Sequence, residues 1–206
     1  MNLAPVFFRF RILLLFPLFL LACLEKADAR IDTVVIDAGH GGHDRGGIPT
    51  NYVTEKNVAL DVALRLRNDL REAGFRVVMT RTNDVFIPLS MRCAIANAQR
   101  RAVFVSIHFN SAANRDARGV ETYYYGSGGG LAASIHRRLT RNLGAPDRRI
   151  RSRRYFVLRN TRIPAVLVEC GFLTNRYDAS LALKSGYRAR LAQEIANAII
   201  ANRRSY

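Results

Sequence analysis

The sequence predicts an α/β fold: a mostly parallel, twisted sheet flanked by helices on both faces, in a single domain. Short apolar runs typical of strands alternate along the chain with stretches of helical periodicity, which is the order that builds parallel sheets. Of the 206 residues, 49% are hydrophobic and 23% are charged, the composition of a globular protein. A chain of this length suits one compact domain and is too short for two ordinary ones.

The first half of the chain contains three expected strands and two expected helices. The β-branched run "TVVIDA" at 33–38 predicts the first strand. The stretch 54–74 predicts a helix, with Thr54 as its N-cap and Gly74 at its end. Its apolar positions recur at i+4 spacing: Val58, Val62, Leu66 and Leu70. The other elements of this half are a strand at 75–80, a helix over about 89–100 and a strand at 102–110. The unbroken apolar run of that last strand indicates burial on both faces.

The second half continues the alternation of strands and helices. Its expected elements are a strand at 119–125, a helix ending near Leu143, a strand at 164–169 and a last helix over about 186–202. The basic segment "DRRIRSRRYFVLRN" at 147–160 predicts no element of its own. No internal repeat or low-complexity linker divides the sequence, so residues 30–206 are expected to form one domain.

Residues 1–29 have the pattern of a segment that exports the protein. Arg9 and Arg11 precede an apolar run that is short for a membrane-spanning helix and is interrupted by a proline. The small residues of "ADA" at 27–29 supply a cleavage site, so the pattern predicts a secretory signal peptide. "LLAC" offers an alternative, a lipoprotein signal ending before Cys23, which would make Cys23 a lipid anchor. Both alternatives export the remaining chain to the periplasm or cell envelope.

The chain is strongly basic, with 32 lysines and arginines, 16 acidic residues and a formal net charge of +16. Residues 1–29 contain only three of the basic residues, so the charge belongs to the exported part. Such a surface attracts polyanions, although basic residues also serve simply to solvate a surface. The export signal, together with the lack of a recognition motif in the sequence, argues against nucleic acid. An anionic polymer of the cell envelope is the expected partner.

Two cysteines, Cys93 and Cys170, follow residue 29. Two cysteines do not make a disulfide framework, and this pair lacks the spacing of a metal site. We expect buried thiols, with a bridge between the two as the alternative.

Three predicted strands carry a histidine or a carboxylate at or just beyond their ends. His40 follows the first strand, His108 lies near the end of the third, and Glu169 ends the strand at 164–169. In open α/β sheets, ligands bind outside the C-terminal ends of the strands. The sequence therefore predicts that two imidazoles and a carboxylate meet at one edge of the sheet.

His40 stands in the stretch "VVIDAGHGGHDRGG", where glycines flank it on both sides. Glycine lets another group approach closely, which suits a ligand histidine on a tight loop; an exposed turn is the alternative. His43 is the rival ligand, but its deeper position in the loop favours solvation or a supporting role. His108 has Ser106 and Asn110 on the same face as supports, and a satisfied core histidine is the alternative. Asn110 is expected to hold either His108 or the substrate.

Further carboxylates complete the set of polar candidates. Glu55 stands in the first turn of the helix at 54–74, where the helix dipole alone would favour an acid. Glu169 needs a partner or a role, because carboxylates are almost never buried without one. Glu121 is a reserve carboxylate that could orient a ligand or the substrate. Two histidines and one carboxylate, with a separate carboxylate as general base, are the parts of a catalytic zinc site.

The chain resembles the zinc-dependent N-acetylmuramoyl-L-alanine amidases of the type 3 amidase family. The resemblance is carried by six segments in the family order: "IDAGHGGHDRGG", "TEKN", "TRTND", "SIHFNSA", "GVETYYY" and "PAVLVECGFLTN". It implies that His40, Glu55 and His108 bind Zn²⁺ and that Glu169 is the catalytic carboxylate. It also implies that the substrate is peptidoglycan, cut between the lactyl group of N-acetylmuramic acid and L-alanine.

Two departures from the family pattern change what the resemblance implies. The family usually has proline and then glycine-alanine where this chain has Arg45, Gly46 and Gly47. This departure puts the rigidity of the loop in question, but not the binding of the metal. The strand at 119–125 leads straight into a helix, with no room for the long helical insertion that blocks the zinc site in regulated members. We therefore expect an open site that needs no obligatory activator.

Two alternatives to an amidase remain. Another envelope zinc hydrolase, such as a carboxypeptidase, would share the metal chemistry but release a terminal amino acid. A wall-binding module that has lost catalysis would share the basic surface. The presence of all four expected site residues disfavours that second alternative.

Overall fold

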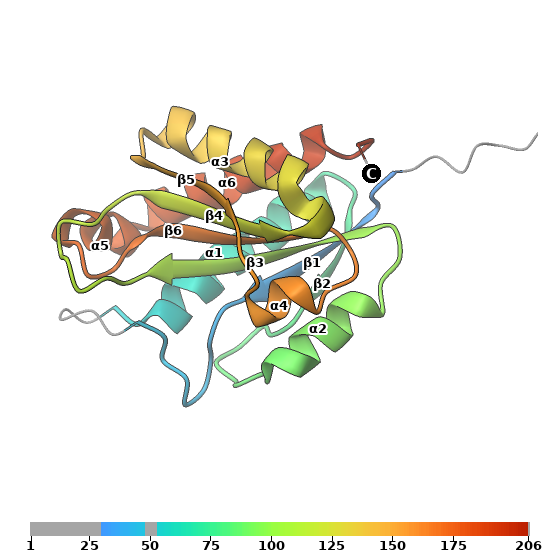
Figure 1. The fold of residues 1–206 in the computed structure, drawn as a ribbon, viewed down its shortest axis with the longest axis horizontal. Helices are drawn as coiled ribbons and strands as arrows, with labels where there is room; N and C mark the ends of the chain where they lie inside the picture. Colours follow the sequence, from blue (N-terminus) through green and yellow to red (C-terminus); the bar gives the residue numbers. More distant parts are fainter. Residues whose placement is uncertain (1–29, 48–52, 206) are drawn as a thin grey trace, which may run out of the picture.

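A mixed sheet runs through the computed structural model, which describes residues 30–47 and 53–205 (Figure 1). Its strands are β1 (Thr33–Ala38), β2 (Arg76–Met79), β3 (Ala102–Asn110), β4 (Val120–Tyr125), β5 (Asp147–Ser152) and β6 (Ala165–Phe172). They lie side by side in the order β2-β1-β3-β6-β4-β5. The first four are parallel, β4 runs antiparallel to β6, and β5 is parallel to β4. The predicted mostly parallel sheet is confirmed, with a reversed pair of strands at one edge.

Helices cover both faces of this sheet, as the sequence predicts. They are α1 (Glu55–Glu72), α2 (Leu89–Asn97), α3 (Gly129–Leu143), α4 (Phe156–Arg159), α5 (Arg176–Leu183) and α6 (Ser185–Ala201), with a 3₁₀ turn η1 (Gly126–Gly128). The larger core joins one face to α1, α3 and α6, where Leu66 and Ile195 are fully buried. The smaller core joins the other face to α2 and α4, around Phe104 and Val157. Figure 1 shows α3 and α6 across the sheet from α2 and α4.

The central strand β3 illustrates why this sequence forms a layered sheet. Val103 and Val105 belong to the larger core, and Phe104 between them belongs to the smaller one. Each fully buried side chain of this size contributes about 1.5–3 kcal/mol. A strand that is apolar on both faces needs helices on both faces, which fixes the three layers. On the face of Phe104, the alternation places His108 near the C-terminal end of the strand.

Several elements of the second half differ from the sequence prediction. β5 and α4 lie in the basic segment 147–160, α5 is an additional helix, and β6 continues past Glu169 to Phe172. β5 is an edge strand, and edge strands are often charged because charge discourages pairing with another chain. That charge hides the alternating apolar pattern that would predict a strand. At the start of α1, Thr54 stands at the N-cap as expected, but its hydroxyl makes no capping hydrogen bond.

Two further sequence predictions concern the N-terminal segment and the cysteines. The signal peptide and the lipid site at Cys23 lie in residues 1–29, outside the described residues. In the part of the chain that the structure describes, no helix is both long enough and apolar enough to cross a membrane. Cys93 and Cys170 are free and buried, so the prediction of buried thiols is confirmed and the bridge is wrong.

Candidate metal and catalytic site

Three elements, β1, α1 and β3, bring two imidazoles and a carboxylate together. His40 lies just after β1, Glu55 is the first residue of α1, and His108 lies near the end of β3. One ligand atom from each residue lies within 4.8 Å of the other two. His40 Nε2 and His108 Nδ1 are each 2.9 Å from the same oxygen, Glu55 Oε1. The three residues that the resemblance implies as metal ligands therefore converge on one point.

Backbone N–H groups hold the Glu55 carboxylate in place. Phe109 N donates to Oε1 at 3.1 Å and Gly47 N to Oε2 at 2.7 Å. Burial alone would raise the pKa of Glu55, but hydrogen bonds from His108 and His40 outweigh it and hold that pKa far below its usual range. Burial lowers the pKa of His108, whereas Glu55 raises it to a net value of about 9. The ionised Glu55 carboxylate stabilises positive charge on the two imidazoles beside it. A divalent cation bound in place of the imidazole protons would balance the same negative charge.

Two glycines leave the space in which these three side chains meet. A Cβ atom on Gly39 would lie 2.4 Å from His108 Cε1, and one on Gly46 would lie 2.5 Å from Glu55 Oε2. Gly46 also has a φ of +71°, in the left-handed region that favours glycine. The glycines around His40 thus permit the close approach of His108 and Glu55. The geometry matches a ligand loop rather than an exposed turn.

Two buried arginines hold the backbone that carries His40. Arg92 Nη2 donates to the His40 carbonyl at 2.7 Å, and Arg81 Nη2 donates to the Gly39 carbonyl at 2.7 Å. Arg92 Nη1 also pairs with Asp37 at 2.7 Å. His40 has a φ of 59°, a conformation that costs an L-residue about 1–2 kcal/mol. The arginines stabilise this strained backbone. Sequence patterns single out neither of them, although Arg81 belongs to the segment "TRTND".

Asp44 orients the imidazole of His40. Its Oδ2 lies 2.9 Å from His40 Nδ1, which leaves Nε2 directed at Glu55. Histidines that bind metals commonly give their other ring nitrogen such a carboxylate partner. A carboxylate within a glycine-rich loop has no periodic signal, so the sequence patterns do not reveal this role. The rival histidine, His43, is exposed and stacks on Phe86 with ring centroids 4.2 Å apart.

Glu169 lies beside the three residues on the neighbouring strand. The register pairs it with His108 on β3 and with Glu121 on β4, so the three side chains share one face of the sheet. Although the residue is partly exposed, its Oε2 atom is shielded from solvent and has no hydrogen-bond partner. Burial raises the pKa of Glu169 to about 7; His108 opposes this rise, and Glu55 and Glu121 add to it. A carboxyl group with such a pKa can exchange protons near neutral pH.

Glu121 accepts a second set of hydrogen bonds. Asn110 Nδ2 donates to its Oε2 at 2.8 Å, and the Tyr123 hydroxyl donates to the same oxygen at 2.5 Å. The expected support of His108 by Asn110 and Ser106 is therefore wrong, because Asn110 donates to Glu121 and Ser106 donates to a buried aspartate on β1. The alternative, that Asn110 holds the substrate, stays a prediction. Glu121 is the register neighbour of Glu169, and its expected role in orienting a ligand or the substrate stays a prediction.

A cavity of about 460 Å³ opens beside His40 and His108. Phe86, Tyr155 and Phe156 line it and remain 39–42% exposed. Apolar walls around a few convergent polar groups are the usual form of a ligand site. A larger hollow of about 560 Å³, lined by Arg76 and Arg101 among others, lies where β2 and β3 begin and is far from these groups. The smaller cavity is the one that adjoins the chemistry.

Comparison with known proteins identifies the family that this chain resembles over most of its length. Residues 34–201 match the family model described as N-acetylmuramoyl-L-alanine amidase. The chain is 37% identical over 169 residues to N-acetylmuramoyl-L-alanine amidase LytC of Bacillus subtilis, covering 80% of this chain and 34% of LytC. It therefore spans about a third of the length of that relative.

Solved structures of N-acetylmuramoyl-L-alanine amidases are similar to this chain in fold and sequence. The catalytic domain of CwlV, an N-acetylmuramoyl-L-alanine amidase from Bacillus (Paenibacillus) polymyxa var. colistinus, is similar with a TM-score of 0.79 and 37% identity, over 82% of this chain and 96% of that one. The CwlD amidase of Clostridioides difficile, solved in complex with the GerS lipoprotein, has a TM-score of 0.78 and 28% identity, over 82% and 96% of the two chains. Both similarities extend over nearly all of the domain described above.

Proposed function

This chain belongs to the N-acetylmuramoyl-L-alanine amidase family, and we propose that it is a zinc-dependent hydrolase of peptidoglycan. The bond cut is the amide between the lactyl group of N-acetylmuramic acid and L-alanine of the stem peptide. One observation carries the proposal: His40, Glu55 and His108 converge beside Glu169, whose Oε2 has no partner. That arrangement combines three metal donors with a separate carboxylate for proton transfer.

The metal would be held by His40 Nε2, His108 Nδ1 and the carboxylate of Glu55. Three protein ligands leave one position open, as in catalytic rather than structural zinc sites. When bound, zinc supplies a Lewis acid that lowers the pKa of water and polarises the scissile carbonyl. Asp44 would keep the imidazole of His40 in the tautomer that binds metal, because it occupies Nδ1.

Glu169 would serve as the proton carrier of the reaction. Its Oε2 is free of hydrogen bonds and lies on the same face of the sheet as His108. In that position it would accept a proton from the attacking water. It would then deliver the proton to the departing amine of L-alanine, because an amine leaves more readily once protonated. The family resemblance and the position of Glu169 both support this role.

The proposed site of action is the periplasm or cell envelope. The pattern of residues 1–29 supports export, either with cleavage after Ala29 or with a lipid anchor at Cys23. The basic surface supports attraction to an anionic wall polymer. A chain that retains Cys23 with an attached lipid would act close to a membrane, whereas a chain cut after Ala29 would diffuse through the compartment.

We also propose that the enzyme needs no activator to uncover its site. Between β4 and α3 the chain passes through the short turn Gly126–Gly128, so no helical insertion occupies this connection. CwlD, whose structure includes GerS, is a relative solved with a partner protein. An activator here would act by some means other than displacing an insertion after β4.

The experiment that tests the proposed function is mass spectrometry of the products released from peptidoglycan sacculi. The zinc-loaded full chain and its Glu169→Gln variant are incubated side by side. Intact stem peptides with an N-terminal alanine, released only by the unsubstituted protein, are the expected result. Shortened stems still attached to sugar would indicate a carboxypeptidase. Zinc binding without release of any product would indicate a wall-binding module.

A further inference from the structure

We propose that Arg148 and Arg151 of β5 form a subsite that binds a free carboxylate of the stem peptide. The enzyme would then prefer acidic stem peptides to those in which the same group is a carboxamide. This inference rests on the proposed function and extends it to the choice of substrate. It concerns the edge of the sheet that lies beyond Glu169 and Glu121.

A bulge in β5 brings these two arginines to the same side of the strand. Across β4, Val120 pairs with Asp147 and Thr122 pairs with Ile150, so β5 contains one more residue than β4 over this interval. Arg149, at the bulge, has a φ of 80°. In a regular strand, residues three apart lie on opposite faces, whereas an extra residue puts them on the same face. The bulge therefore aims both arginines at the face that carries the candidate site.

Both arginines reach the same oxygen of Glu121. Arg148 Nε lies 3.2 Å from Glu121 Oε1, and Arg151 Nη1 lies 3.8 Å from it. Arg148 is also fixed by its stacking on Phe172, with the guanidinium carbon 4.8 Å from the ring centroid. One carboxylate shared by two guanidinium groups leaves one positive charge unbalanced. An anionic ligand would balance it.

The two side chains are open to such a ligand. Arg148 is 36% exposed and Arg151 is 39% exposed, whereas Glu121 between them is only 5% exposed. A guanidinium group has five N–H donors in a planar fork that matches a carboxylate. Glu121 therefore acts as a buried anchor for the pair, and the exposed part of each arginine side chain is accessible to a ligand. The pair also offsets the negative charge of Glu121, which would otherwise repel an acidic peptide from Glu169.

The distance from the metal ligands suits a peptide that crosses the sheet. Glu121 is the register partner of Glu169, which is the register partner of His108, so two strand spacings separate Glu121 from His108. Two spacings amount to about 10 Å, which about three extended residues span. A stem peptide with its first amide at His108 would bring its second or third residue over Glu121, which the side chains of Arg148 and Arg151 reach from β5. These second and third stem residues are the ones that carry carboxylates in acidic stems.

The test compares two soluble muramoyl peptides that differ only in one stem group, a free carboxylate or a carboxamide. The zinc-loaded full chain is expected to have the higher kcat/KM on the acidic peptide. In the double variant Arg148→Gln/Arg151→Gln, kcat/KM on the acidic peptide should fall about 10–100-fold, the range expected for lost charge-assisted hydrogen bonds. The loss should appear mainly in KM, and the amide peptide should be affected little. Arg148→Lys/Arg151→Lys should restore part of the preference.

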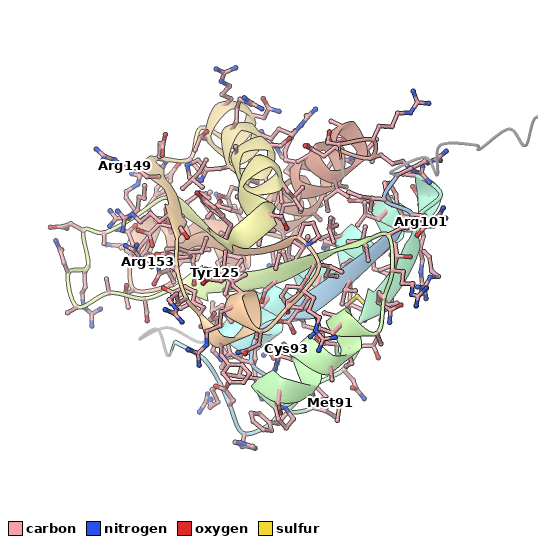
Figure 2. All side chains as sticks on the ribbon, turned by 45° about the vertical axis from the view of Figure 1, so that its right-hand side comes forward. Met91, Cys93, Arg101, Tyr125, Arg149 and Arg153 are labelled. Carbon is pink, nitrogen blue, oxygen red and sulfur yellow. The ribbon has the colours of Figure 1, made fainter. Side chains whose placement is uncertain are left out.

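The matched control is the double variant Arg149→Gln/Arg153→Gln, which removes the same charge from the same segment. Figure 2 shows Arg149 and Arg153 along the edge of the molecule formed by β5, and both are exposed. The control should keep the preference for the acidic peptide. An equal loss in both double variants would show that only net charge matters and would overturn the subsite. A chain without substitutions that cleaves both peptides equally well would overturn it too.

Binding of the free stem peptides, measured by calorimetry, separates the subsite from the proposed function. Tighter binding of the acidic peptide that disappears in Arg148→Gln/Arg151→Gln, with no cleavage of any substrate, would support the subsite and contradict the amidase. Cleavage without a difference between the acidic and amide peptides would support the amidase and contradict the subsite.

Discussion

The two sides of the candidate site differ in how completely their polar groups are paired. On the β1 side, Arg81 and Arg92 hold the carbonyls around His40, and Asp44 holds its ring. On the β6 side, Glu169 Oε2 has no partner. Farther along, at β4 and β5, two arginines share one carboxylate oxygen.

On the β1 side, Arg81, Arg92 and Asp44 form a fully paired frame around His40. On the β6 side, Glu169 leaves an oxygen open to a ligand. A buried polar group without a hydrogen bond costs about 1–3 kcal/mol, so the unpaired Glu169 Oε2 beside three convergent donors points to a functional role. The β1 side is built before any ligand arrives, which suits residues that must hold an ion in fixed geometry. The β6 side leaves groups for the water and the substrate to complete.

Removing either imidazole ligand should abolish metal binding. His40→Ala and His108→Ala should each lose the bound zinc, and activity should fall to background, because two protein ligands remain where catalytic sites use three. Metal content of the purified variants, measured by inductively coupled plasma mass spectrometry, is the readout. His43→Ala is the control and should keep its zinc. Stoichiometric zinc in both ligand variants would contradict the site.

Glu169→Gln should separate proton transfer from metal binding. The variant should keep its zinc, because Glu169 is not among the three convergent donors. Its turnover should fall about 10²–10⁴-fold, the usual range for loss of a general acid–base group. Turnover of muramoyl peptide together with metal content gives both readouts. A fully active variant would remove Glu169 from the mechanism.

Arg92→Met should show how much Arg92 contributes to the free energy of unfolding. It leaves Asp37 buried without its ion pair and frees the His40 carbonyl. Breaking a buried pair typically costs about 3–5 kcal/mol of the free energy of unfolding, which denaturant titration measures. Arg100→Met, at an exposed position between α2 and β3, should change stability by less than about 0.5 kcal/mol. Equal effects in the two variants would refute the special role of Arg92.

Asp44→Ala should weaken zinc binding without abolishing it. Loss of a carboxylate that orients a ligand histidine typically costs about 10–100-fold in metal affinity. Competition with a chromogenic chelator measures this affinity, and the free energy of unfolding should change little because Asp44 is on a half-exposed loop. An affinity within twofold of the unsubstituted protein would show that the arginines alone position His40.

The amino-acid sequence predicted the strands correctly where the alternation of neighbouring residues indicates them. The strand expected at 33–38 and the one expected at 102–110 have the same bounds as β1 and β3. The family expected from the six segments is confirmed by the match over residues 34–201. The elements not predicted are β5, α4 and α5, and the first two lie in a basic segment at the edge of the sheet. There the charge of an edge strand masks the alternation on which prediction depends.

The order of the strands and helices other than β5, α4 and α5, and the position of His40, His108 and Glu169 near the ends of strands, follow from the amino-acid sequence alone. They do so because strand and helix periodicity is a property of nearby residues. The meeting of His40 and His108 with Glu55 at hydrogen-bonding distance, and the hydrogen bond of Asn110 to Glu121 instead of His108, depend on the tertiary structure. Arg92 reaches the His40 carbonyl from 52 positions along the chain, and the register of separate strands aligns Glu121 with Glu169. Contacts of this kind depend on how the layers pack, and no local pattern encodes them.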